Sequence, residues 1–113
     1  MGKALIEKLL RSNPQISRIY VLLRSKRNKT IEERLKVLLE DAVFKRVRTE
    51  QPDCLAKIVA IEGDCCKLQL GISSENLQKL KSVNIVYHSA ASVRYRSISH
   101  LYTDDILTTY CMY

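Results

Sequence analysis

Cysteine, histidine and arginine side chains are the residues of this sequence that could do chemistry, and their spacing favours binding over catalysis. Cys65 and Cys66 could supply a thiolate nucleophile only beside an activating partner, and the sequence identifies none. His88 stands apart from His100 and from any carboxylate cluster at metal-ligand spacing. It is therefore interpreted as a structural histidine, and no metal site is predicted. The 4 cysteines show no zinc-like spacing, so we expect reduced thiols.

Positive charge is the main compositional feature, and it is local. The chain has 19 Lys and Arg against 12 Asp and Glu, a formal net charge of +7. Much of the excess lies in the groups Arg24–Lys29, Lys45–Arg48 and Arg94–Arg96. Such groups favour anionic partners, including nucleotides, coenzyme A, nucleic acids and acidic membrane surfaces. With 113 residues and 46% hydrophobic residues, we expect one small domain with a core.

Amphipathic segments alternate with apolar runs along the chain. In Lys3–Ser12, the residues Ala4, Leu5, Leu9 and Ser12 form a stripe, with Ile6 and Leu10 beside it, and predict a helix that ends at Asn13-Pro14. The continuous run Ile19–Leu23 predicts a strand buried on both faces. Further on, the sequence predicts a helix from Thr30 with a capping box to Glu33, a strand leading to Gly63-Asp64, a helix capped by Ser73 or Ser74, and a buried strand over Asn84–His88.

The order αβαβαβ predicts a parallel sheet with helices on both faces. Ligands bind such a sheet outside the carboxyl ends of its strands. The residues that follow Leu23, Ile61 and His88 are therefore candidates for binding. Ser97–Tyr113 has no clear periodicity and gives little indication of an ordered element.

Taken together and in this order, these segments resemble the fatty acyl-CoA reductases of animals and plants, which are extended short-chain dehydrogenases. The resemblance covers Met1 to Tyr95 and rests on Met1-Gly2-Lys3 before the first helix, Ile19–Arg24, Thr30–Leu35, Ile61–Asp64 and Asn84–Arg94. It implies an α/β, partial Rossmann-like three-layer fold with a parallel sheet, in which the first strand and the catalytic half are missing. Residues 1–96 would form a partial NAD(P)-binding domain, and residues 97–113 an atypical tail.

The resemblance implies NADP(H) as the cofactor and places its contacts. Gly2 would let the first helix pack closely on the sheet and let the pyrophosphate approach the helix terminus. Arg24 would grip the 2′-phosphate of the adenosine ribose, where an acidic residue would favour NAD instead. Arg27 or Lys26 would add auxiliary contacts.

Further cofactor contacts would follow the next two strands. In the family, a Gly-Asp step meets the adenine, which assigns Asp64 to the exocyclic amino group with Cys65 alongside. Ala90, Ala91 and Ser92 resemble the small-residue segment that lets the backbone approach the ribose and pyrophosphate.

Catalysis in this family needs a tyrosine and a lysine four residues later on one helical face. None of the 6 tyrosines is followed by lysine at that spacing. We therefore predict no catalytic residues in this chain and no activity of the chain alone. The resemblance implies that the full-length enzyme reduces long-chain acyl-CoA with NADPH, through an enzyme-held aldehyde, to a fatty alcohol.

The cellular location of the protein can also be predicted. No apolar run reaches the ~20 residues of a membrane helix, so the chain itself is expected to be soluble and intracellular. Family members associate with peroxisomal or endoplasmic-reticulum membranes, through regions that this chain would lack.

One alternative to a fatty acyl-CoA reductase is another extended short-chain dehydrogenase, such as an epimerase. The other is a non-catalytic basic binding module, although nucleic acid is not expected as a partner because aromatic residues are not interleaved with the charges.

Overall fold

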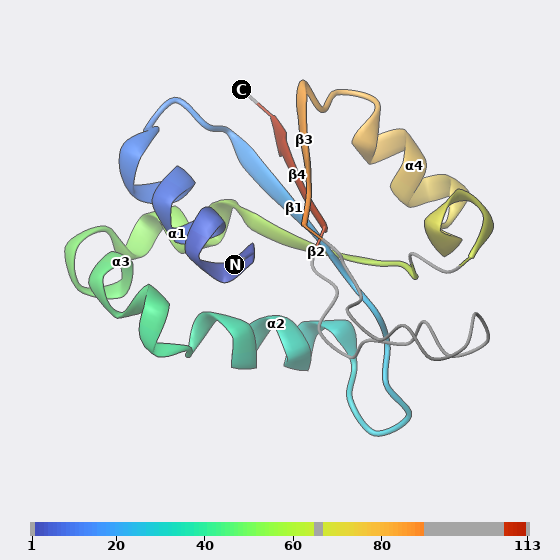
Figure 1. Cartoon of the computed structure of the whole chain (residues 1–113), viewed down its shortest axis with the longest axis horizontal. Coiled ribbons are helices and arrows are strands. Elements are labelled where there is room, and N and C mark those ends of the chain that lie inside the picture. The colour runs from blue at the N-terminus through green and yellow to red at the C-terminus, as the bar shows by residue number, and fades with distance from the viewer. Residues whose placement is uncertain (1, 65–66, 90–107, 113) are drawn as a thin grey trace.

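The computed structural model describes residues 2–64, 67–89 and 108–112. One sheet runs through the molecule with helices on both of its faces (Figure 1). In chain order the elements are α1 (Gly2–Ser12), β1 (Arg18–Leu23), α2 (Ile31–Leu39), the short 3-10 helix η1 (Ala42–Phe44), α3 (Lys45–Glu50), η2 (Pro52–Lys57), β2 (Ile58–Glu62), η3 (Leu68–Gly71), α4 (Ser74–Leu80), β3 (Ile85–His88) and β4 (Thr108–Met112).

Helix α1 forms where the amphipathic pattern predicts it, but its buried face is shifted. Ile6, Leu9 and Leu10 are buried, whereas Ala4 and Ser12 are exposed. The predicted stripe through Ala4 and Ser12 was therefore wrong, because the larger side chains beside it bury more apolar surface against the sheet.

An ion pair joins the start of α1 to the N-cap residue of η1. Lys3 Nζ lies 2.7 Å from Asp41 Oδ2. The hydrogen bond from Lys3, followed by the one from the backbone N–H of Val43, lowers the pKa of Asp41 below its ordinary value. Asp41 thus stays ionised and caps η1 while it holds α1 beside this turn.

Strand β1 is the centre of the core and confirms the prediction of a strand buried on both faces. Its alternate residues Ile19, Val21 and Leu23 pack in a cluster with residues of α1, α2 and α3. Tyr20 and Leu22 point to the other face and pack with Ile61 and Ile72, and with part of α4. This alternation follows from the two-residue period of a strand.

The sheet is mixed, with strand order β2-β1-β4-β3. The predicted parallel pairing is confirmed for β1 and β2, which run in register from Ile19↔Ile58 to Leu23↔Glu62. Strand β4, in contrast, pairs antiparallel with both β1 and β3. A wholly parallel sheet was therefore wrong, and a strand forms in the segment whose sequence indicated no element.

Local capping signals are confirmed at two helix starts. The hydroxyl of Thr30 accepts from the Glu33 N–H at 3.3 Å, and the Thr30 N–H donates to the Glu33 carboxylate at 2.9 Å. Ser73 caps α4 by accepting from the Asn76 N–H at 3.3 Å. These bonds satisfy backbone donors that have no partner within the helix.

Strand β3 is half-buried, so the prediction of a fully buried strand was wrong. Ile85 and Tyr87 pack on the cluster that contains α1, whereas Val86 on the other face is 57% exposed. Among the described residues, Leu77 and Leu80 of α4 pack with the cluster of Tyr20, Leu22 and Ile61, and that cluster contains no residue of β3. In the described ranges, no helix has the length and apolar character that crossing a membrane requires.

Candidate functional site

The carboxyl ends of β1 and β2 bring together the two charged residues that the sequence analysis singled out. Arg24 directly follows β1, and Asp64 stands two residues after β2. The N–H of Gly63 donates to the carbonyl of Leu23 at 3.0 Å, so the pairing continues past the strand ends. As a result, Arg24 Nε lies 3.6 Å from Asp64 Oδ2.

The backbone of Arg24 is held by the neighbouring helix. Arg34, in α2, donates from Nη1 to the carbonyl oxygen of Arg24. The side chain of Arg24 remains 39% exposed, while that of Asp64 is 14% exposed. Arg24 is therefore the more exposed partner of this pair, and its guanidinium is accessible to a ligand in solution.

Gly63 permits this close approach because it has no side chain. A Cβ at this position would lie 2.3 Å from Leu22 Cδ1 and 2.8 Å from the carbonyl oxygen of Leu70. Both distances are below any normal contact, so only glycine fits without movement of the strand or the loop.

The loop after Asp64 folds back onto the strand end. The N–H of Asp64 donates to the Leu70 carbonyl at 2.7 Å. Gln69, Leu70 and Gly71 all have φ between 51° and 57°, a left-handed conformation that is strained for the first two. No pattern in the sequence predicted this turn, and Gly71 is the local signal for it.

A pocket of ≈ 320 Å³ lies between the end of β1 and this loop. Its walls combine cationic, anionic and small residues: Arg24, Ser25, Glu62, Gly63, Asp64, Lys67 and Gly71. Lys67 is a cation that the sequence analysis missed, because its place in the pocket depends on how the loop folds. Its short distance along the chain from the Gly63-Asp64 step was the available clue.

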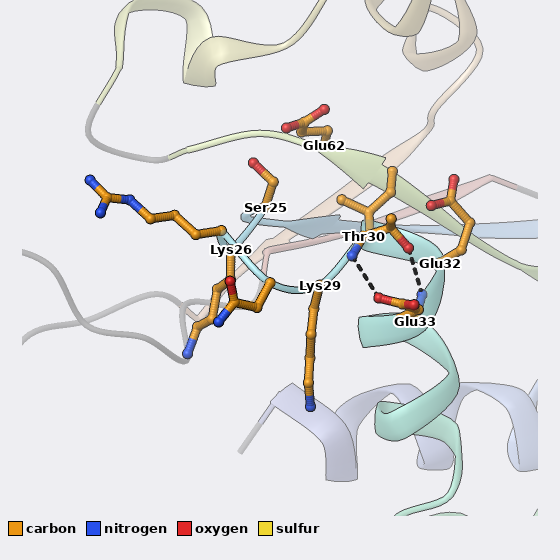
Figure 2. A pocket seen from close by; sticks show the side chains of 10 residues that line it. Ser25, Lys26, Lys29, Thr30, Glu32, Glu33 and Glu62 are labelled. Atoms are coloured by element: carbon orange, nitrogen blue, oxygen red, sulfur yellow. Dashed lines mark hydrogen bonds between the residues drawn. The ribbon is translucent and has the colours of Figure 1, made fainter.

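The basic loop after β1 lines a second, larger pocket of ≈ 630 Å³, to which Arg27 belongs. Figure 2 shows the loop with Ser25, Lys26 and Lys29 beside the capped start of α2, and Glu62 lies above Ser25 and Thr30 in this view. The N–H of Lys29 donates to the carbonyl of Lys26 at 3.1 Å and closes the loop into a turn. Ser25 and Glu62 line both pockets, so the two adjoin.

The remaining candidates are placed as follows. Gly2 is the first residue of α1, as expected for the start of that helix, but it lines neither of these two pockets. Cys65, Ala90, Ala91 and Ser92 lie outside the described residues. Among residues 2–64, 67–89 and 108–112, no group of three or more His, Cys, Asp or Glu could hold a metal ion.

Comparison with known proteins gives the class first. Residues 1–106 match the model of an NAD(P)-binding family described as male sterility protein. The relatives then narrow the class. Fatty acyl-CoA reductase 1 of Homo sapiens is 42% identical over 96 residues, which are 84% of this chain and 19% of that protein. Fatty acyl-CoA reductase 2 of Bos taurus is 38% identical over the same shares of both chains.

An insect relative agrees with these two. A putative fatty acyl-CoA reductase of Drosophila melanogaster is 42% identical over 95 residues, 82% of this chain and 18% of its own length. No solved structure matches the chain. The chain belongs to the fatty acyl-CoA reductase family, and it spans about a fifth of the length of the curated relatives that it matches.

Proposed function

We propose that the pocket at Arg24 and Asp64 binds the adenosine end of NADP(H). The observation that carries this proposal is the 3.6 Å pair of these two residues at the carboxyl ends of adjacent parallel strands. Ligands of α/β sheets bind at this edge. The guanidinium of Arg24, after β1, suits a 2′-phosphate through two parallel hydrogen bonds. The carboxylate of Asp64, after β2, can accept a hydrogen bond from the adenine amino group.

We infer that the fold is a partial Rossmann-like arrangement of three layers. In that fold the strand order begins 3-2-1-4. The order β2-β1-β4-β3 supports the inference if β2, β1 and β3 correspond to the third, second and fourth strands. Strand β4 then takes the place of the first strand, with the opposite direction. Residues 1–96 would carry the cofactor-binding part, and residues 97–113 an atypical tail.

The activity of the whole enzyme follows from the relatives. Because these relatives are named fatty acyl-CoA reductases, we propose that this chain forms part of an enzyme that reduces long-chain acyl-CoA to fatty alcohol with NADPH. No tyrosine of the chain is followed by lysine four residues later, which supports the absence of catalysis by these 113 residues alone. By family resemblance, the enzyme would act at the peroxisomal or endoplasmic-reticulum membrane.

The first test measures binding of NADP⁺ and NAD⁺ to the purified chain by calorimetry. The wild type should prefer NADP⁺, and Arg24→Ala should lower NADP⁺ affinity by about 10- to 100-fold, the scale of a hydrogen bond between charged groups. NAD⁺ affinity should change little. Arg46→Ala is a matched control, because Arg46 is exposed on α3 and, among the described residues, forms its ion pair with Glu50 of the same helix.

Two outcomes would contradict the proposal. One is unchanged selectivity in the Arg24→Ala variant. The other is binding to unrelated polyanions with the same affinity and a steep salt dependence, which would favour a basic, non-catalytic binding module instead.

A further inference from the structure

Lys67 lines the pocket at Arg24 and Asp64, and nothing in the family resemblance assigns it a role. We propose that Lys67 is a second phosphate-binding cation of this pocket and therefore a residue that determines specificity for a phosphorylated nucleoside. This inference rests on the proposed function, since it concerns the same site. The inference adds Lys67 to Arg24 as a source of positive charge for the phosphate.

The charges of the pocket lead to Lys67. Two cations, Arg24 and Lys67, share its walls with two carboxylates, Glu62 and Asp64. Arg24 is already within 3.6 Å of Asp64, which offsets part of its charge. Lys67 is exposed, and in the described part of the chain its side chain forms no hydrogen bond or ion pair. Its ammonium group is therefore the less neutralised cation, and it can give a phosphate dianion a second favourable contact beside Arg24.

The stem of Lys67 is positioned by the loop. Its N–H donates to the Asp64 carbonyl at 3.0 Å, and its carbonyl accepts from the Leu70 N–H at 3.1 Å. A Cβ at Gly71 would lie 3.0 Å from Lys67 Cδ and 3.4 Å from Lys67 Cβ. The lysine stem thus lies across the bare backbone of Gly71, whose φ of +57° also favours glycine.

This packing has a consequence for affinity. A lysine whose stem is held by its own loop loses less side-chain freedom when its ammonium group binds a ligand than a free surface lysine does. Lys67 also follows Asp64 by three residues, so one short loop would present both the adenine contact and the phosphate contact. The two contacts would then bind a single nucleotide together.

The experiment compares three variants of the chain by calorimetry with NADP⁺ and NAD⁺ as probes. Lys67→Gln keeps most of the stem on Gly71 but removes the charge, Lys67→Ala removes both, and Lys79→Ala is the control. Lys79 is an exposed lysine of α4, and within the ranges that the structure describes its ion pair is with Glu75 of the same helix. Circular dichroism and urea unfolding establish that each variant is folded, and Lys67→Gln carries the test if Lys67→Ala is not.

We expect Lys67→Gln to lower NADP⁺ affinity by roughly fivefold to tenfold, the scale of one partly exposed charge contact. NAD⁺ affinity should stay within about twofold, because the lost contact is to the extra phosphate. The dependence of NADP⁺ affinity on salt should also become shallower, which a purely structural role of Lys67 would not produce. Lys79→Ala should match the wild type in all three measurements.

The outcomes separate this inference from the function on which it rests. If Lys67→Gln binds NADP⁺ like the wild type while Arg24→Ala does not, the role of Lys67 is overturned and the cofactor site stands. An equal loss of NADP⁺ and NAD⁺ affinity in Lys67→Gln would likewise overturn a specific phosphate contact. If the folded wild type binds neither dinucleotide, the proposed function itself fails.

Discussion

Gly63 shows how one residue lets two strand ends approach each other. Because a Cβ there would overlap Leu22 and the Leu70 carbonyl, Gly63→Ala should destabilise the chain by about 1–3 kcal/mol, the usual cost of overpacking a core. Urea unfolding monitored by circular dichroism measures this. The double variant Leu22→Ala/Gly63→Ala should lose less stability than the sum of both single variants, since shortening Leu22 removes one overlap. An unchanged unfolding midpoint in Gly63→Ala would contradict the close contact.

Helix α2 shows how an element serves the site through its first turn. The Thr30–Glu33 capping box begins the helix, and one turn further on Arg34 bonds the carbonyl of Arg24. Thr30→Ala should therefore destabilise the chain by about 1 kcal/mol, the typical value of a lost helix cap. Thr30→Ser keeps the accepting hydroxyl and should remain close to the wild type in urea unfolding. Equal stability of Thr30→Ala and Thr30→Ser would argue against the cap.

The sheet as a whole depends on β4, which lies between β1 and β3. Tyr110 is opposite Tyr20 on one side and Val86 on the other. Tyr110→Pro removes a backbone donor from the middle of the sheet, so it should cost at least ~1 kcal/mol and reduce the protection of β1 amides against hydrogen exchange. Tyr110→Phe keeps the donor and serves as the control. Unchanged protection in Tyr110→Pro would mean that β1 does not need this partner.

Much of the layout was predictable from the sequence because its signals are local. A capping box is complete within four residues, and the run Ile19–Leu23 has no polar residue that could face water. Arg24 and Asp64 could be named as candidates because each follows a predicted strand, where ligands of such sheets bind, whereas the role predicted for each came from the family resemblance. Their actual meeting required only that β1 and β2 pair in parallel.

The sequence by itself therefore predicted α1, β1, α2, β2 and α4, and it placed Arg24 and Asp64 after predicted strands. Tertiary structure alone decided that Arg24 meets Asp64, that β4 enters the middle of the sheet, that Val86 of β3 is exposed, and that Lys67 lines the pocket with Arg24. The physical reason is the range of the interactions. Caps and apolar runs act over a few residues, whereas strand pairing and pocket walls join residues distant in the sequence, whose partners no local pattern specifies.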